Sequence, residues 1–279
     1  MNARQQLEQA LRGVADGRIV PYLGAAVAGL GTGLVPASPA ALAAVIEAAV
    51  RVPRRASGNL WAAAQFVETR RRRRTVAALV ERAFAAPTND NPIHGWLAKV
   101  RPPLVVDAWY DTGLLDAFAA SSAAAFNWGW VEGVSRHDAS DDAWTRAFDR
   151  RGFHRPKGPD PAWSSFVYKP HGCARAGSSF LLSDSDYVQV LTEIDIQTPI
   201  PVEVRQRRRD RGFLFLGTRF DDQLLRIFAR QIMKRSRGPH VAVLDGPLTR
   251  MEGRFLEAQN IERIDLDLVD VAAALRVAA

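Results

Sequence analysis

The chain contains 279 residues, of which 47% are hydrophobic and 24% are charged, the proportions of an ordinary globular protein. Its formal net charge of +7 comes almost entirely from arginine, because the sequence holds only four lysines. Cys173 is the only cysteine, which excludes an internal disulfide and a zinc module built from several cysteines of one chain.

Membrane insertion is not indicated, because no apolar stretch reaches the roughly 20 residues that a membrane helix needs. The richest stretch, Leu34 to Val50, is interrupted by two prolines, a serine and a glutamate. The opening MNARQQLEQALRG has no apolar core of a secretory signal. We therefore expect a cytoplasmic protein without a membrane partner.

Hydrophobic spacing predicts helices and strands that alternate along most of the chain. The expected helices cover about 7–14, 38–50, 59–69, 75–85, 92–100, 112–120, 183–192, 223–233 and 269–277. The expected strands cover about 18–23, 104–108, 125–133, 165–172 and 213–217, followed by HVAVLDG and IERIDLDL. A further short helix is expected within the irregular stretch 137–161.

This alternation is typical of the α/β class, with a Rossmann-like, doubly wound, mostly parallel sheet and helical insertions. We expect one domain over residues 1–279. A helical insert at about 38–100 would separate the first two strands, and an irregular insert would occupy about 134–162.

The first candidate site is the glycine-rich turn GAAVAGLGTG, which follows the strand RIVPYL. Glycines at a strand end let backbone N–H groups approach phosphate, and the N-terminus of a following helix adds positive potential. The spacing differs from the G-x-G-x-x-G fingerprint, because Ala26 stands two residues after Gly24. A flexible loop accounts for the same glycines equally well.

Chemically active side chains follow two more predicted strands. In VVDAWYD, Asp107 and Asp111 flank Trp109 and Tyr110, and in KPHG the strand ends at His171. Ligands are held at the carboxyl ends of strands in α/β sheets, and histidine can act as a general base near neutral pH. The mouth of the VVDAWYD strand is therefore either a catalytic tip or an aromatic binding surface.

The third candidate is LGTRFDDQLLR, where a strand-end glycine precedes a helix start. A carboxylate there, at Asp221 or Asp222, is expected to cap the helix, and the alternative role is acceptor for a ribose hydroxyl. His94 and His240 are expected to be structural. No pair of histidines has the spacing of metal ligands, so we expect no metal site.

The order of these stretches resembles the sirtuin-like (silent information regulator-like) domains of bacteria. Their glycine-alanine-glycine turn is matched by LGAAVAG, their histidine helix by IHGWLAKV and their Thr-Thr-Asn-Tyr-Asp strand end by VVDAWYD. Their Lys-x-His-Gly is matched by KPHG, their acidic helix start by SDSDY and their last strand and helix by FLFLGTRFDDQLLR. The ordered set spans about residues 19–268.

The resemblance implies a Rossmann-like sheet that binds NAD at its strand ends, in the branch that lacks the zinc module and cleaves NAD to nicotinamide and ADP-ribose. It implies catalytic roles for His171 and Asp111 in an active chain. Asp107 replaces a threonine of the family motif, and in an active chain Asp107 or Asp111 would hold a water molecule or stabilise the oxocarbenium-like state. The resemblance also implies that the nucleotide, NAD or ADP-ribose, is bound by residues at the strand ends: Gly24, Ala25, Ala26, Ala28, Trp109, Tyr110, His171, Gly217, Thr218 and Asp222.

One departure from the family pattern bears on activity. Trp109 stands where the family has Asn, and a tryptophan cannot orient water through an amide. Removal of one positioned polar donor can lower a rate by about 10²–10³-fold. We therefore expect a catalytically degenerate nucleotide-binding protein that senses a nucleotide or regulates a partner, and a rearranged NAD hydrolase is the alternative.

Arginines cluster in two runs, 70–74 and 205–211. Solvated helix faces and loops are the favoured interpretation of such runs, and nucleic-acid binding through them is the weaker alternative. The expected partners are a nucleotide and, for a regulatory role, another protein or a second copy of the chain.

Overall fold

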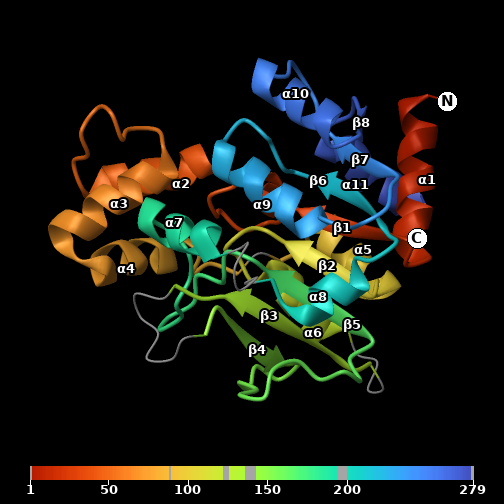
Figure 1. The fold of residues 1–279 in the computed structure, drawn as a ribbon, viewed down its shortest axis with the longest axis horizontal. Coiled ribbons are helices and arrows are strands. Elements are labelled where there is room, and N and C mark those ends of the chain that lie inside the picture. Colours follow the sequence, from red (N-terminus) through yellow and green to blue (C-terminus); the bar gives the residue numbers. More distant parts are fainter. Residues whose placement is uncertain (1, 88, 122–125, 136–142, 194–199, 278–279) are drawn as a thin grey trace.

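The computed structural model describes the chain except for residues 1, 88, 122–125, 136–142, 194–199 and 278–279 (Figure 1). The described residues form an eight-stranded sheet with the order β4-β3-β5-β2-β1-β6-β7-β8. Neighbouring strands are parallel, except for the antiparallel pair β3 and β4. The strands are β1 Ile19–Leu23, β2 Leu104–Asp107, β3 Trp128–Gly133, β4 Thr145–Asp149, β5 Ser165–Lys169, β6 Gly212–Leu216, β7 His240–Val243 and β8 Ile261–Ile264.

The predicted α/β fold with a doubly wound, mostly parallel sheet is confirmed. Strand β1 lies between β2 and β6, so the chain extends the sheet in one direction through β2 and β5 and later in the other through β6, β7 and β8. Where the winding reverses, helices leave the sheet on opposite faces and a crevice forms at the carboxyl ends of the strands. That reversal occurs beside β1.

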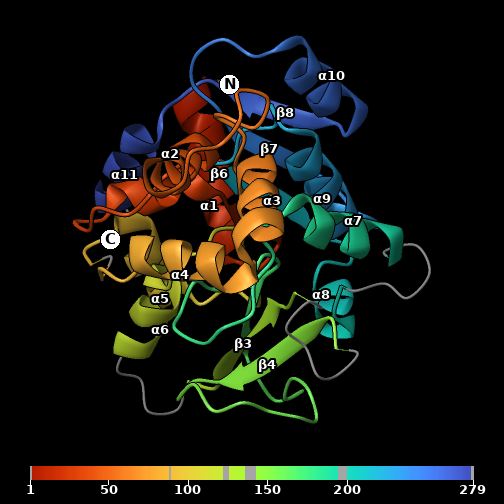
Figure 2. The same cartoon turned by 90° about the vertical axis from the view of Figure 1, so that its left-hand side faces the viewer.

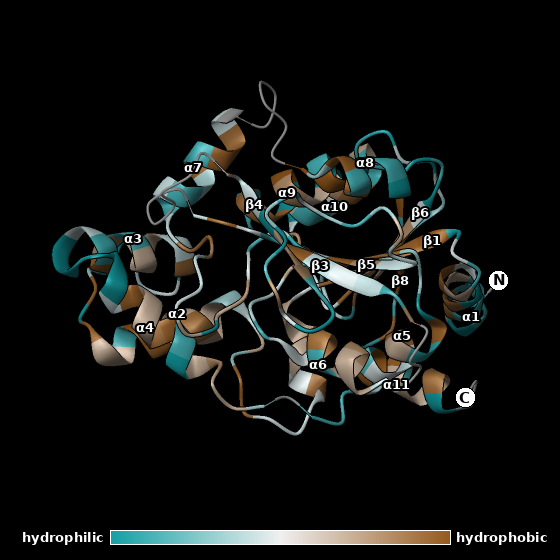
Figure 3. Ribbon diagram, turned by 90° about the horizontal axis from the view of Figure 1, so that it is seen from below, coloured by the Kyte–Doolittle hydropathy of each residue, from teal (hydrophilic) through white to brown (hydrophobic). Residues whose placement is uncertain are grey.

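Helices cover both faces of the sheet, as the edge-on view in Figure 3 shows. Alternate residues of a strand point to opposite faces, and the buried residues form two matching clusters. One cluster joins the sheet to α1 (Ala3–Ala15), α5 (Pro92–Val100), α6 (Gly113–Ala120) and α11 (Leu268–Val277). The other joins it to α7 (Asp184–Glu193), α8 (Val202–Arg207), α9 (Gln223–Met233) and α10 (Arg250–Ala258), together with three helices of the insert.

The insert helices are α2 (Pro39–Ala49), α3 (Leu60–Arg71) and α4 (Arg73–Ala83), which lie together in Figure 2. Local capping explains where they begin. The Ser38 hydroxyl accepts a hydrogen bond from the Ala41 N–H at 3.0 Å, and the Asn59 side chain accepts one from the Ala62 N–H at 2.9 Å. Such caps satisfy N–H groups that the first helical turn leaves without partners.

The irregular stretch differs from its prediction. The described part, from residue 143 onward, contains strand β4 and no helix, and the remainder of 137–161 lies outside the described residues, as does residue 125 of the third expected strand. Strand β4 forms because it pairs with β3, where the Phe148 ring stacks on Trp130 with centroids 5.2 Å apart. Helices α8 and α10 were not predicted either. No helix among the described residues has the length and apolarity to cross a membrane.

Candidate functional site

The sheet brings the predicted site residues to one edge. Strands β5, β2, β1 and β6 are consecutive neighbours, and each ends at a candidate. His171 follows β5, Asp107 ends β2, Gly24 follows β1 and Gly217 follows β6. Because parallel strands place their carboxyl ends on the same side, candidates as far apart in sequence as Gly24 and Gly217 lie along one edge of the sheet.

The glycine turn packs directly against the end of β6. The Gly24 N–H donates to the Leu216 carbonyl at 2.8 Å, and the Ala26 N–H donates to the Gly217 carbonyl at 3.1 Å. A Cβ on Gly24 would lie 2.2 Å from the Thr218 Oγ1, so only glycine fits this contact. The turn continues as the 3₁₀ helix η1 (Ala25–Leu30), in which Ala26 is exposed.

A buried asparagine, which the sequence analysis did not identify, supports this turn. The Asn91 side-chain amide donates to the Val27 carbonyl at 2.7 Å, and its oxygen accepts from the N–H groups of Ile93 and His94 at the start of α5. Asn91 thus fixes η1 to the helix beside it. Its place before Pro92, the first residue of α5, is the signal for a helix cap.

The two aromatic residues after β2 point into the protein. Trp109 is 3% exposed, packs against the rings of Phe84 and Tyr110, and donates its indole N–H to the Pro36 carbonyl at 2.7 Å. Tyr110 is fully buried and donates its hydroxyl to the Leu181 carbonyl at 2.8 Å. Both rings therefore join the insert to the sheet, and stacking of Trp109 on a nucleotide base stays a prediction.

Asp107 is held in a buried ion pair. Its carboxylate accepts from the Lys169 ammonium at 2.5 Å, and both side chains are almost inaccessible. Burial raises the pKa of Asp107 to about 6, although the positive charge of Lys169 acts in the opposite direction. Burial alone would lower the pKa of Lys169, but the negative charge of Asp107 outweighs it and the pKa is raised. The sequence analysis did not identify Lys169 as the partner of Asp107. The register of β2 beside β5 is the feature that brings the two residues together.

Asp111 performs a structural task at the start of α6. Its Oδ1 accepts from the Gly113 N–H at 2.9 Å, and the residue is 3% exposed. A carboxylate in this position satisfies a free N–H and complements the positive helix end.

His171 lies in an aromatic enclosure. Its Nδ1 is 2.9 Å from the Tyr187 hydroxyl, and its ring contacts Tyr110, Tyr187 and Phe228. Burial, and next the charge of Lys169, lower its pKa to about 3. Its Nε2 is buried without a hydrogen-bond partner among the described residues.

Thr218 and Asp222 differ in how far their side chains are engaged. Thr218 is 6% exposed, and no described residue pairs with its Oγ1. Asp222 is the N-cap of α9, and its Oδ1 accepts from the Leu224 N–H at 2.7 Å. The capping interpretation is thus confirmed for Asp222, and its contact with a ribose stays a prediction.

Comparison with models of protein families identifies the family of this chain. The model of the SIR2-like domain family matches residues 103–264, more than half of the chain. The chain belongs to the SIR2-like domain family. The match includes the ends of β2, β5 and β6, whereas the glycine turn after β1 precedes it. No curated protein matches the chain.

Membership of the SIR2-like family indicates a function related to NAD in broad terms. Thr218 Oγ1 and His171 Nε2 are two of several buried side-chain atoms without a partner in the described part of the chain, and as buried polar atoms near strand ends they would suit hydrogen bonds from a nucleotide. The Asp107 and Asp111 carboxylates, in contrast, already have hydrogen-bond partners within the protein. Within the described ranges, no three His, Cys, Asp or Glu residues are grouped as metal ligands.

Proposed function

We propose that this SIR2-like chain binds a nucleotide of the NAD or ADP-ribose type without cleaving it, and that binding serves a sensing or partner-regulating role. One observation carries the proposal: the three candidate catalytic side chains are engaged inside the protein. Asp107 pairs with Lys169, Asp111 caps α6 and His171 is enclosed by aromatic rings.

The state of His171 argues against general base catalysis. A catalytic base works best when its pKa lies near the working pH. Burial holds the pKa of His171 near 3, so the imidazole remains neutral and is a weak base at neutral pH. Its Nδ1 side is already occupied by the Tyr187 hydroxyl.

Binding is supported by the positions of Thr218 Oγ1 and His171 Nε2. His171 follows β5 and Thr218 follows β6, which are three strand steps apart across β2 and β1. At about 4.8 Å per step the two strand ends are roughly 14 Å apart. This separation suits an extended nucleoside diphosphate sugar, which could satisfy a polar atom at each end.

One observation favours the alternative, an NAD hydrolase with a rearranged site. The pKa of Asp107 is raised to about 6 by burial, which brings a carboxyl group near the range of a general acid or base. In that case release of Lys169 on ligand binding would free the carboxylate to hold a water molecule.

The proposal is tested by thermal unfolding with NAD and with ADP-ribose, alongside measurement of nicotinamide release. Saturation at about 100 times Kd should stabilise the chain by about 2.7 kcal/mol, a shift of several degrees, without nicotinamide release. Steady nicotinamide release that scales with protein concentration would support the hydrolase instead. The absence of a shift with either nucleotide would overturn both.

A threonine variant adds a test of the site itself. Thr218→Val should weaken nucleotide binding about 5-fold, the effect of one lost hydrogen bond, while the free protein becomes slightly more stable because a buried unpaired hydroxyl is removed. Thr192→Val is the matched control, since Thr192 is exposed and its hydroxyl donates to the Val188 carbonyl one helical turn earlier. Equal binding by both variants would place the nucleotide away from β6.

A further inference from the structure

The two arginine runs have different structural roles. In the second run, inward-pointing guanidinium groups donate to backbone carbonyls: Arg207 to Pro103 and Trp163, Arg208 to Gln231 and Ile232, and Arg211 to Gly17. Asp210 lies among them. That run is therefore mainly part of the scaffold that ties α8 to the rest of the fold.

The first run forms a corner on the surface. Helix α3 ends at Arg71 and α4 begins at Arg73, so a single residue joins them. Arg70, Arg71, Arg72 and Arg74 are exposed, and we call these four residues the basic corner. Among the residues that the structure describes, none of the four has a carboxylate within ion-pair distance. The outer end of α3 is correspondingly hydrophilic in Figure 3.

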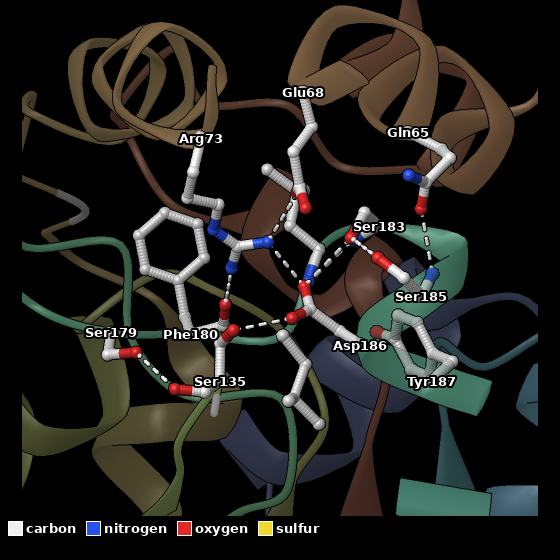
Figure 4. Close-up of polar contacts among 12 residues, drawn as sticks. Gln65, Glu68, Arg73, Ser135, Ser179, Phe180, Ser183, Ser185, Asp186 and Tyr187 are labelled. Atoms are coloured by element: carbon white, nitrogen blue, oxygen red, sulfur yellow. Dashed lines mark hydrogen bonds and ion pairs between the residues drawn. The ribbon is translucent and has the colours of Figure 1, made fainter. Parts of the chain in front are cut away.

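Arg73, the remaining arginine of the run, points inward and anchors this corner (Figure 4). Its guanidinium group is 2.5 Å from the Asp186 carboxylate and 2.9 Å from that of Glu68, and it donates to the Phe180 carbonyl. The basic corner is therefore displayed from a fixed base, which lowers the ordering cost of a contact.

The corner reverses the usual preferences of a helix start. Helix α4 has no side-chain cap and no acidic residue in its first turn, where Arg73 and Arg74 stand instead. Arg72 has φ 90° and ψ 151°, a backbone conformation that strongly favours glycine. Arg73 is compensated by its ion pairs with Asp186 and Glu68, whereas no described carboxylate pairs with Arg72 or Arg74, so the unfavourable backbone and charge at these two positions point to an external role.

We propose that the basic corner is a binding surface for the phosphate backbone of duplex nucleic acid. The basic corner includes none of the strand-end residues of the proposed nucleotide site, and its role goes beyond the proposed function. Binding is expected to depend on charge and not on base sequence, because arginines that contact phosphates orient a protein on the duplex without distinguishing the bases.

The surroundings of the corner favour a duplex over other polyanions. Single strands are bound through exposed aromatic platforms, whereas Phe66, the ring that Arg70 contacts with its guanidinium 5.9 Å from the centroid, is partly buried. Stable membrane anchoring adds an apolar chain or face to a basic patch, and protein interfaces centre on buried anchors, which are mostly aromatic. None of the exposed large hydrophobic residues lies on the described parts of α3 or α4.

The test is fluorescence anisotropy with a labelled 20-base-pair duplex DNA between 50 and 300 mM NaCl. The variant R70Q/R71Q/R72Q/R74Q is compared with R205Q/R209Q/R235Q/R237Q, which removes the same charge from exposed arginines near the second run. Loss of four phosphate contacts should lower the slope of log K against log salt by about 3.6 and weaken binding at least 10-fold at 50 mM NaCl. The control variant should bind nearly as the wild type does.

Three results would overturn the proposal: no duplex binding by the wild type at 50 mM NaCl, equal loss in the two variants, or preferential binding to single-stranded DNA or to vesicles of anionic lipid. Arg72→Gly separates folding from binding. Because glycine relieves the strained backbone, this variant should melt at a higher temperature and yet bind the duplex more weakly. A variant that melts higher and binds as the wild type does would show that Arg72 is no contact.

Discussion

At the residue scale, three buried polar groups lie next to one another near the end of β5: the hydroxyls of Tyr110 and Tyr187 and the imidazole of His171. The Tyr187 hydroxyl lies 2.9 Å from His171 Nδ1 and 3.4 Å from the Tyr110 hydroxyl. Burial raises the pKa values of both tyrosines above the ordinary value, so all three groups are neutral near pH 7. These contacts orient the ring of His171 and leave its Nε2 without a hydrogen-bond partner among the described residues.

The lowered pKa of His171 predicts a loss of stability in acid. The unfolded chain takes up this proton near pH 6.5 and the folded chain only near 3, so stability is complete above about 6.5 and decreases as the pH falls toward 3. His171→Phe should reduce this acid loss by on the order of 3 kcal/mol at pH 4, measured by urea unfolding. Exposed His154, replaced by Gln, is the control. An unchanged pH dependence in H171F would contradict the burial of a neutral imidazole.

The sequence predicted where the site residues would gather, but not which way they would point. Strand ends could be located because apolar runs stop at Asp107 and before His171, and parallel topology makes those ends neighbours. The direction of Trp109 could not, because it depends on the Pro36 carbonyl, which is 73 residues away in sequence. An aromatic residue at a strand end can serve either as ligand platform or as core.

At the element scale, β2 and β5 are joined by their ladder and by the Asp107–Lys169 pair that crosses it. Val106 is opposite Tyr168, so the next residues of the two strands, Asp107 and Lys169, come side by side at the strand ends. A charge that is removed from water at this depth needs its counter-ion. The pair therefore acts as a fixed link between the ends of β2 and β5.

Breaking this pair on one side should be costly. Asp107→Asn leaves the Lys169 ammonium buried without a counter-ion, and the free energy of unfolding should fall by about 3–5 kcal/mol. The double variant D107L/K169M replaces both charges by apolar side chains and should recover most of that loss. Urea unfolding of D107L, K169M and the double variant at pH 7 measures the coupling. Additive losses would show that the two side chains do not act as a pair.

At the scale of the whole molecule, most of the sheet could be predicted from the sequence, whereas the way the insert attaches to it could not. The strands are apolar runs bounded by glycine, proline or polar residues, which is a local signal. The insert is held to the sheet by contacts between distant segments: the Trp61 ring packs 4.9 Å from Tyr187, and Arg73 reaches Asp186. Strand β4 likewise forms through pairing with β3 and has little apolar pattern of its own.

Arg73, Glu68 and Asp186 form a charged cluster, shown in Figure 4, which we call the Arg73 cluster. This cluster should therefore control whether the insert unfolds together with the sheet. Burial would raise the pKa of Asp186, but Arg73 and the hydrogen bonds from Ser135, Ser183 and Leu182 overcome it and hold that pKa below the ordinary value. The stability from this carboxylate is present above the unfolded pKa of about 3.9 and is lost as the pH falls through the lower folded value. At neutral pH the cluster is charged and intact.

Arg73→Met should leave Asp186 buried without its cation and destabilise the docked insert by about 3–5 kcal/mol, because an uncompensated buried charge costs this much. The loss falls on the insert, so hydrogen exchange followed by mass spectrometry should show faster exchange in α3 and α4 while β1, β2 and β6 keep their protection. R73M/D186N should restore much of the protection, and R70M, at an exposed position of the basic corner, should change neither region. Uniformly faster exchange over insert and sheet in R73M would show instead that the two unfold as one unit and that the cluster stabilises the whole molecule.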